Sequence, residues 1–193
     1  MCIRDRSWNP LEGDPDVILR SKGPFDAVCW AQGKNCNDSI FNFDTEVHKS
    51  MYEANVLYIL KSLSYLLQNN LLKKPAKLCI LSSIWQDISR QDKLSYGVTK
   101  SAIRGLVLSL ANDLGEEGHL VNAVLPGALD TSMTRSNLTE SQLAKIVEGT
   151  QFGRLPSLSD VANTVHFLCS EENTGLTGQF IKVDLGFSDV RIV

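Results

Sequence analysis

Short apolar runs alternate with longer amphipathic segments along most of this chain. The short runs have the length of buried β-strands, and the longer segments carry apolar residues at three- and four-residue spacing, as one face of a helix does. Strands that alternate with helices favour a parallel sheet with crossover helices. We therefore predict four parallel strands in one three-layer α/β domain: Phe25–Ala31, Ala76–Leu81, Leu120–Leu125 and Gln179–Val183.

The amphipathic segments predict two long helices and two shorter ones. The second long helix has its apolar residues in a single stripe, and Gly115 follows it as a stop signal. A polar stretch separates the third strand from the first short helix. The predicted helices are Thr45–Asn69, Asp92–Leu114, Glu140–Glu148 and Ser159–Leu168.

The chain of 193 residues contains no internal repeat and no linker between domains. Its length suits a single core. We predict one domain over residues 25–193. Residues 1–24 have no periodicity and are expected to be an irregular or non-native remnant, in which Met1–Arg6 resembles a scar of sequencing or assembly.

Composition excludes several classes of protein. The net charge of −3 gives no basic footprint for nucleic acid or an anionic membrane surface. The longest apolar run, Ile103–Ala111, is too short to span a bilayer. The five cysteines are odd in number and scattered, and the three histidines lack the spacing of metal ligands. These features predict no metal site and a protein of the reducing cytoplasm.

Tyr96 and Lys100 are the first candidates for chemistry. Four residues apart on a helix, they share one face. A tyrosine hydroxyl has a pKa near 10, and a nearby ammonium group favours the phenolate form that can act as a base. Taken alone, however, such a pair is more often an ordinary pair on a helix surface.

Two polar residues upstream strengthen this interpretation. Ser83 follows the strand Ala76–Leu81, and the carboxyl ends of strands are where open α/β sheets bind ligands. Asn55 lies in the middle of an otherwise apolar helical stretch, where an amide side chain calls for an explanation.

Together these residues resemble the short-chain dehydrogenase/reductase family in its compact form. The family's catalytic Asn-Ser-Tyr-Lys tetrad falls on Asn55, Ser83, Tyr96 and Lys100. The resemblance covers about residues 25–187 and implies a doubly wound, Rossmann-like sheet. Further matching segments are Val121–Gly127, Gly153–Pro156, Asp160–Asn163 and Thr177–Asp184.

The resemblance implies hydride transfer between NAD or NADP and a carbonyl or alcohol substrate. Tyr96 would be the general acid/base, Lys100 would lower its pKa and hold the nicotinamide ribose, Ser83 would bind the substrate oxygen, and Asn55 would hold a water. It also implies a homodimer or homotetramer paired through the helix Asp92–Leu114. The implied cofactor-binding residues are Ala31, Gly33, Tyr96, Lys100, Pro126, Gly127 and Thr131.

Three departures from the family pattern limit what it implies. The Asn-Asn-Ala-Gly turn is replaced by Trp30-Ala31-Gln32-Gly33, and the Asp-Gly-Gly turn by Asp184-Leu185-Gly186. No two glycines are separated by a single residue, so the glycine-rich phosphate loop is missing. We therefore expect a chain that is truncated at its N-terminus, lacks the first βαβ unit, and is inactive by itself.

Two other functions stay open at this stage. A catalytically inactive relative that serves only for association would explain the missing phosphate loop, although it would have no need of Lys100 beside Tyr96. A sugar-nucleotide epimerase or dehydratase would share the Tyr-x-x-x-Lys motif. Such enzymes usually have a larger C-terminal substrate domain than the residues after Gly127 could form.

Overall fold

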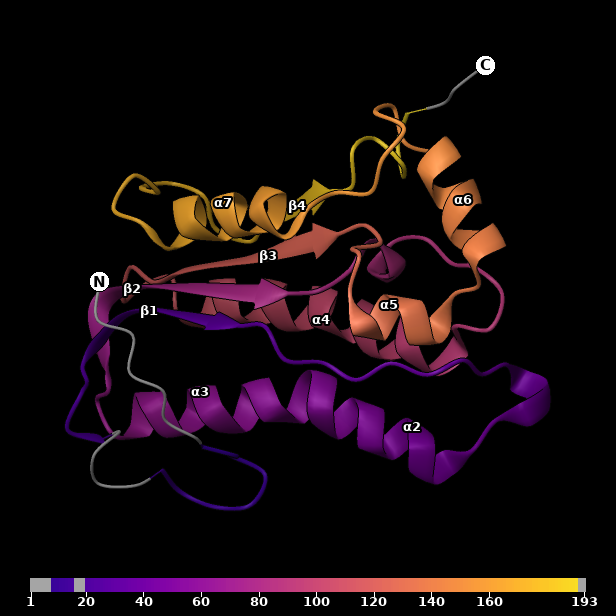
Figure 1. Cartoon of the computed structure of the whole chain (residues 1–193). Helices are drawn as coiled ribbons and strands as arrows, with labels where there is room; N and C mark the ends of the chain where they lie inside the picture. The colour runs from indigo at the N-terminus through magenta and orange to yellow at the C-terminus, as the bar shows by residue number, and fades with distance from the viewer. Residues whose placement is uncertain (1–7, 16–19, 191–193) are drawn as a thin grey trace.

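A computed structural model describes residues 8–15 and 20–190 of the chain. Figure 1 shows a central sheet with helices on both faces, so the predicted three-layer α/β arrangement is confirmed. The interpretation of Met1–Arg6 as a scar falls outside the described residues. Residues 8–15 form turns and irregular backbone, and Trp8 packs edge-on against Tyr65 at a centroid distance of 5.3 Å.

The sheet consists of four parallel strands in the order β1-β2-β3-β4, as predicted. Three of them lie within one residue of the predicted bounds. β2 is longer because it begins at Leu72 instead of Ala76. Its first half contains Lys73, Lys74 and Pro75, so the apolar pattern in the sequence identified only the second half of the strand. The strands are β1 (Phe25–Trp30), β2 (Leu72–Leu81), β3 (Leu120–Pro126) and β4 (Phe180–Val183).

One edge of this sheet is formed by β1. Within the part of the chain that the structure describes, β1 pairs with β2 only, and Cys29 on this strand is exposed. An uncovered strand edge presents unpaired N–H and C=O groups to whatever comes near.

The first long helix is continuous from Thr45 to Gln68 but contains one π-helical turn. It is divided into α2 (Thr45–Tyr52), the π turn (Glu53–Leu57) and α3 (Tyr58–Gln68). The Asp44 carboxylate begins it by accepting hydrogen bonds from the N–H groups of Glu46 and Val47, at 2.8 and 3.0 Å.

The second long helix, α4, begins later than its sequence pattern suggested. Asp92 has a φ of 57°, in the left-handed region, so it cannot be part of a right-handed helix. One short helix, α5, was not predicted because its sequence is polar apart from Met133 and so has no apolar periodicity. The remaining helices are α4 (Leu94–Asp113), α5 (Ser132–Asn137), α6 (Glu140–Glu148) and α7 (Leu158–Cys169), with 3₁₀ turns at Ile40–Asn42 and Ile84–Gln86.

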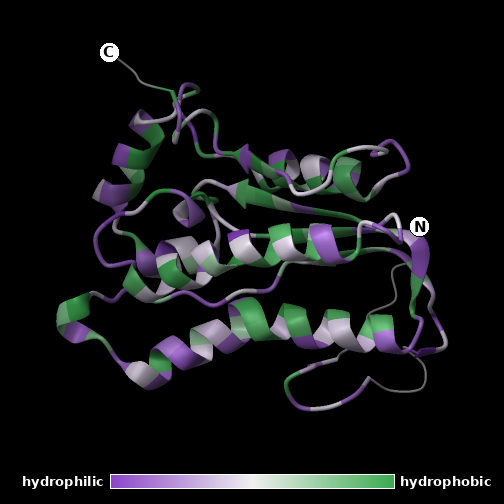
Figure 2. Cartoon of the chain, turned by 180° about the vertical axis from the view of Figure 1, so that it is seen from behind, coloured by the Kyte–Doolittle hydropathy of each residue, from purple (hydrophilic) through white to green (hydrophobic). Residues whose placement is uncertain are grey.

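Two hydrophobic clusters hold the layers together, one on each face of the sheet. Alternate side chains of β2 point to opposite faces, so Leu78 and Ile80 belong to the larger cluster while Cys79 belongs to the smaller. The larger cluster packs α3 and α4 against the sheet, and the smaller packs α7 against the other face. In Figure 2 the strands between these helices are mostly hydrophobic, while the helices show polar residues on their outer sides.

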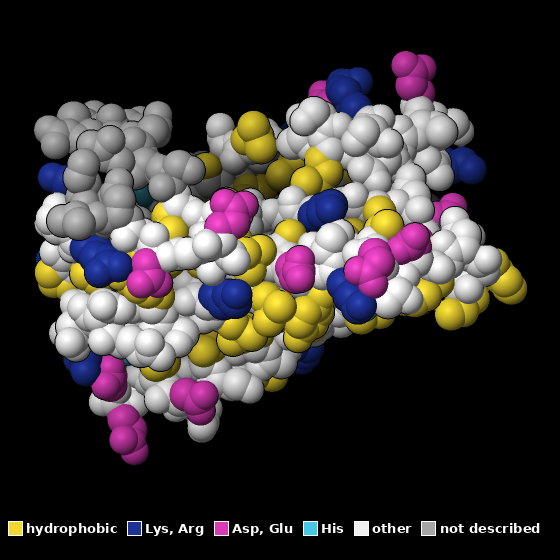
Figure 3. Space-filling view, turned by 90° about the horizontal axis from the view of Figure 1, so that it is seen from below, with side chains coloured by type: hydrophobic (Ala, Val, Ile, Leu, Met, Phe, Trp, Pro, Cys, Tyr) yellow, Lys and Arg dark blue, Asp and Glu magenta, His cyan; other side chains and the backbone are white. Residues whose placement is uncertain are grey.

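The surface carries charges of both signs with apolar patches between them. Seen from below in Figure 3, hydrophobic side chains form a band across this face, with lysine, arginine and acidic groups scattered along it. Several large apolar side chains of α2, α3 and α4 are exposed: Val47, Tyr52, Leu60, Val98 and Leu108. No helix within the described residues is long and apolar enough to cross a membrane.

Candidate active site

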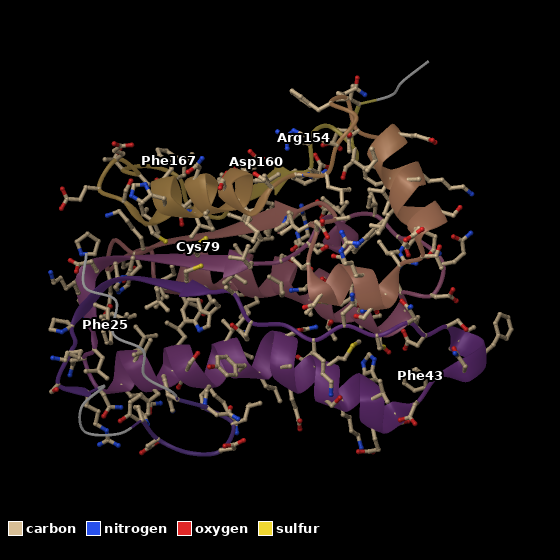
Figure 4. All side chains as sticks on the ribbon, in the orientation of Figure 1. Phe25, Phe43, Cys79, Arg154, Asp160 and Phe167 are labelled. Carbon is tan, nitrogen blue, oxygen red and sulfur yellow. The ribbon has the colours of Figure 1, made fainter. Side chains whose placement is uncertain are left out.

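A pocket of about 400 Å³ lies at the carboxyl ends of the strands, where β1, β2 and β3 end and α5 begins. In Figure 1 the strand arrows point toward α5 and α6, and in Figure 4 Phe25 marks the amino end of the sheet and Phe43 lies near the opposite end. The pocket's position follows from the parallel sheet, which brings the residues after each strand to one edge. Its lining includes eight of the predicted residues: Ala31, Gly33, Ser83, Tyr96, Lys100, Pro126, Gly127 and Thr131.

Ser83 and Tyr96 meet in this pocket as the sequence predicted. Ser83 follows β2 directly, and Tyr96 lies in the first turn of α4; both are buried. Burial raises the pKa of Tyr96, and a hydrogen bond with the Ser83 side chain lowers it in part. The net direction is upward, opposite to the lowering that Lys100 was expected to cause. Desolvation of the phenolate therefore dominates at this site.

Lys100 is buried one turn after Tyr96 on the same helix face. Its Nζ lies 5.7 Å from the centroid of the Tyr96 ring and donates a hydrogen bond of 3.1 Å to the Leu81 carbonyl oxygen. Burial lowers the pKa of Lys100 to about 8. Within the described residues this is its one hydrogen bond, so two of its three N–H donors are available to another molecule.

Asn55 lies in the π turn and is almost completely buried. Its Oδ1 accepts from the Lys34 N–H at 2.8 Å, and its Nδ2 donates to the Lys34 carbonyl and to Thr99 Oγ1, at 3.0 and 2.9 Å. These bonds join the loop after β1 to α4. Both amide N–H groups are therefore used by the protein, and the lone pair left on Oδ1 is what its side chain could offer a water. π turns are frequent at functional sites.

Gly33 separates Asn55 from Lys100. A Cβ atom at this position would lie 3.3 Å from Asn55 Oδ1 and 3.7 Å from Lys100 Nζ. A side chain there would therefore project over the ammonium group and block access to it. This accounts for the glycine, the one residue of the family's turn sequence that stands at its expected place.

Trp30 explains the main departure at that turn. Its ring is buried in the larger cluster, and its Nε1 donates a 2.7 Å hydrogen bond to Ser62 Oγ on α3. The position that carries an amide in the family pattern thus supports the core here. Ala31 and Gln32, which follow it, line the pocket.

The turn after β3 is locked against the C-terminal segment. The Gly127 N–H donates to the Val183 carbonyl at 2.9 Å, and a Cβ at Gly127 would come within 2.9 Å of the Asp184 Cβ. The Asp184 carboxylate accepts from the N–H groups of Gly186 and Ser188. Leu185, which replaces a glycine of the family pattern, has a φ of 55° and so adopts the left-handed conformation that glycine favours.

The outer wall of the pocket comes from α5. Thr131 is its N-cap, and its hydroxyl accepts from the Thr134 N–H at 3.2 Å. The predicted Thr131 position is thus in the pocket wall, but the rest of this wall was missed because the segment has no apolar pattern. The lining residues that sequence reasoning did not identify are Gln32, Leu81, Ser82, Leu129, Ser132, Met133 and Thr134.

Three cysteines meet away from this pocket, between the sheet and α7. Cys79 is labelled there in Figure 4, below the α7 ribbon. Hydrogen bonds with Cys169 and Cys29, together with burial, raise the pKa of Cys79. Across the described residues, no group of three or more histidine, cysteine or acidic side chains is placed to hold a metal ion.

Comparison with known proteins agrees with this geometry. A family model described as "Enoyl-(Acyl carrier protein) reductase" matches residues 18–188. The oxidoreductase YmfI of Bacillus subtilis, itself uncharacterized, is 30% identical over 169 residues, which cover 85% of this chain and 67% of that protein. The 3-oxoacyl-[acyl-carrier-protein] reductase FabG of Escherichia coli is 26% identical over 176 residues, which cover 91% of this chain and 72% of that protein.

Solved structures share the fold. A short chain dehydrogenase family protein from Francisella tularensis superposes with a TM-score of 0.81 at 26% identity, covering 89% of this chain and 75% of its own. A gluconate 5-dehydrogenase from Burkholderia cenocepacia, solved with NADP and tartrate, gives a TM-score of 0.83 at 18% identity, covering 90% and 71%. The second likeness concerns the fold alone. With the Ser83, Tyr96 and Lys100 side chains gathered in one pocket and a family model matched over most of its length, this chain belongs to the short-chain dehydrogenase/reductase family.

Proposed function

We propose that this chain is the catalytic part of an NAD(P)-dependent oxidoreductase that acts on a carbonyl or alcohol group. The observation that carries the proposal is the meeting of Tyr96, Ser83 and Lys100 in one buried pocket at the carboxyl ends of the strands. A proton donor, a second hydroxyl and a cation at the mouth of such a sheet are the groups that carbonyl reduction requires.

The pocket suits a nicotinamide cofactor on the side of Lys100. Two of the lysine's N–H donors are unused by described residues, and Gly33 leaves the space above them open. Ribose hydroxyls are suitable acceptors for these donors. When bound, the reduced cofactor would supply the hydride, and titration with NADH and NADPH distinguishes between the two cofactors.

Tyr96 would act as the proton donor when a carbonyl is reduced. Because burial raises its pKa, the phenol is protonated at neutral pH and holds the proton that the alkoxide product needs. Ser83 Oγ, a hydrogen-bond partner of the phenol, would bind the same substrate oxygen and orient it toward the tyrosine. Lys100 would stabilise the phenolate that forms after proton transfer.

The substrate is expected to be uncharged at its reacting end. Apart from Lys100, the residues that line the pocket carry no charge, and Leu81, Leu129 and Met133 make part of its wall apolar. Burying an unpaired charge among such groups would be costly. A ketone or an aldehyde with an apolar or hydroxylated neighbouring group fits this lining.

Replacement of Tyr96 by phenylalanine tests the proposal. We expect the reduction of carbonyl substrates by NADH or NADPH to fall at least about 100-fold, since general acid catalysis contributes on the order of 10² to 10⁴. The assay should use the longest product of the gene and follow nicotinamide absorbance. Tyr58→Phe, which removes a phenol hydroxyl that bonds the Trp8 carbonyl outside the pocket, is the matched control. Unchanged turnover in Tyr96→Phe would exclude the proposed role.

A further inference from the structure

Lys93 is a second buried lysine near the pocket, and the mechanism proposed above does not use it. It precedes α4 directly and is 3% exposed. Its Nζ lies within hydrogen-bond distance of four oxygens: Asn35 Oδ1 at 2.7 Å, the Cys36 carbonyl at 2.9 Å, Asn37 Oδ1 at 2.7 Å and Asn137 Oδ1 at 3.3 Å. None of these acceptors is a carboxylate.

These oxygens belong to two segments that are far apart in the sequence. Asn35, Cys36 and Asn37 follow β1 in the loop whose first residues form one wall of the pocket, and Asn137 is the last residue of α5, which forms the opposite wall. Asn37 Nδ2 also donates to the Asn137 carbonyl at 3.1 Å. Lys93 therefore lies at the point where the two walls are joined.

Few other interactions hold α5 in place. It has no buried residue, and its Arg135–Asp130 ion pair lies within its own segment. Within the described residues, its hydrogen bonds to the rest of the protein are those of Asn137 with Lys93 and Asn37. A helix of this kind cannot rely on packing for its position.

The start of α4 does not require the Lys93 side chain. The Asp38 carboxylate accepts from the Ser95 N–H at 3.0 Å, and the Asp38 carbonyl accepts from the Leu94 N–H at 3.2 Å. These bonds serve the first two N–H groups of the helix, and the Gly97 N–H donates to the Lys93 main-chain carbonyl, so none of the three uses the Lys93 side chain. Burial of the ammonium is nevertheless unfavourable, since it lowers the pKa of Lys93 to about 8. A buried cation with no carboxylate partner calls for a function other than capping the helix.

We propose that Lys93 is a positioning residue that holds α5 against the loop after β1 and so fixes the width of the pocket between these two walls. This inference rests on the proposed function, and it names the contact that joins the two walls of that site. The Lys93 Nζ also lies 5.5 Å from the centroid of the Tyr96 ring, so the same cation borders the ring of the proton donor.

Amide hydrogen exchange of the purified protein tests the positioning role without any need for activity. In Lys93→Met, exchange in residues 132–138 should become about ten times faster, while exchange in α7 stays as in the wild type. Lys145→Met, at an exposed lysine on α6, is the matched control and should leave α5 unchanged. Equal exchange in α5 of the wild type and Lys93→Met, or equal acceleration in α5 and α7, would overturn the proposal.

Asn137 provides a second variant in case Lys93→Met does not fold. Asn137→Ala removes the acceptor on α5 and leaves Lys93 with its other partners, so α5 alone should exchange faster. Asn137→Asp keeps an oxygen for the ammonium and should retain the wild-type exchange. If Asn137→Ala leaves the exchange of α5 unchanged, the link between the two walls does not hold the helix.

Steady-state kinetics test whether the contact between Lys93 and α5 affects substrate binding in the pocket. In an active preparation, Lys93→Met should raise KM for the carbonyl substrate about five- to ten-fold with less than a two-fold change in kcat, and Lys93→Arg should restore part of the loss. An unchanged KM together with faster exchange in α5 would overturn the claim that Lys93 sets the pocket. If no preparation is active, the proposed function fails while the exchange data still decide whether Lys93 positions α5.

Discussion

Lys100 shows how a residue proposed to take part in the chemistry can lower stability. The Lys100 ammonium is buried, has one hydrogen bond to the Leu81 carbonyl, and has no carboxylate partner among the described residues. Burial therefore lowers its pKa from 10.5 to about 8. At neutral pH the folded protein must hold a charge that the unfolded chain would expose to water, which disfavours folding.

Replacing Lys100 by methionine should abolish activity but stabilise the protein at neutral pH. The shift from 10.5 to about 8 corresponds to at most about 3 kcal/mol, reduced by roughly 1 kcal/mol for the hydrogen bond that is lost. Between pH 8 and 10.5 the folded state binds fewer protons than the unfolded state, so wild-type stability rises with pH in this window. The advantage of methionine should thus be largest below pH 8 and vanish near pH 10.5.

Urea unfolding of both proteins at pH 7 and pH 10 measures this difference. Lys61→Met, at an exposed lysine on α3, should change the free energy of unfolding little at either pH and serves as the control. A Lys100→Met protein that is less stable than the wild type at pH 7 would show that the ammonium has a stabilising partner which the structure does not contain.

Helices α6 and α7 begin with the same kind of capping box, but only α7 has buried residues. Ser157 and Asp160 form a capping box at α7, which packs against the sheet through Val161 and Leu168. Thr139 and Gln142 form the same kind of box at α6, which has no buried residue. The structural consequence of losing a cap should therefore differ between the two helices.

Ser157→Ala should lower the global free energy of unfolding by about 1 kcal/mol, because the Asp160 N–H loses its acceptor in a helix that belongs to the core. Thr139→Ala removes the equivalent bond to the Gln142 N–H, but it should only fray α6 and leave the global value unchanged. Chemical denaturation of the two variants makes the comparison. Equal losses in both would mean that α6 unfolds together with the core.

On the scale of the whole molecule, the place of β1 at the edge of the described sheet bears on cofactor binding. A dinucleotide site of the doubly wound type takes the pyrophosphate at a helix N-terminus after a glycine-rich turn and the adenosine across neighbouring strands. Within the described residues no strand lies beyond β1, and the sequence has no such glycine turn. The described residues contain the proposed nicotinamide side of the site, with Lys100 and Gly33.

We therefore predict that the 193-residue chain by itself binds NADH and NADPH poorly and turns over no substrate. Titration of the purified chain with each cofactor, followed by nicotinamide fluorescence, measures this directly. The longest product of the gene should bind one of the two cofactors more tightly and thereby decide between NAD and NADP. Micromolar binding by a monodisperse preparation of the 193-residue chain would contradict the prediction.

The exposed apolar residues of α4 bear on assembly. Val98 and Leu108 are each 48% exposed on a helix whose other face lies in the core. The family resemblance implied pairing of this helix between subunits, and we propose that these side chains contribute to the contact. Val98→Asp with Leu108→Asp should convert a dimer or tetramer into a monomer in sedimentation velocity, whereas Phe152→Asp, at a residue exposed on another surface, should not. An assembly state unaffected by the α4 double variant would exclude this helix as the interface.

The sequence by itself determined the order and type of the main elements. Apolar runs and helical spacing identified the four strands and the long helices, since these patterns reflect burial on one or both faces. The spacing of Ser83, Tyr96 and Lys100, taken together with the family resemblance, also predicted their meeting, because a helix turn and a strand end restrict where such residues can lie. Trp30 and Leu185 show the limit of this reasoning: their departures from the family pattern were visible, but their reasons were not.

Only the tertiary structure decided the details that depend on contacts between distant segments. The π turn around Asn55 is accompanied by hydrogen bonds to Lys34 and Thr99, which no local pattern encodes. The upward shift of the pKa of Tyr96 depends on how completely the pocket excludes water. The place of α5, a polar helix without a buried residue, depends on Lys93 and Asn37, which come from other parts of the chain. Hydrophobic periodicity records what is buried, whereas polar links of this kind leave no periodic signal in the sequence.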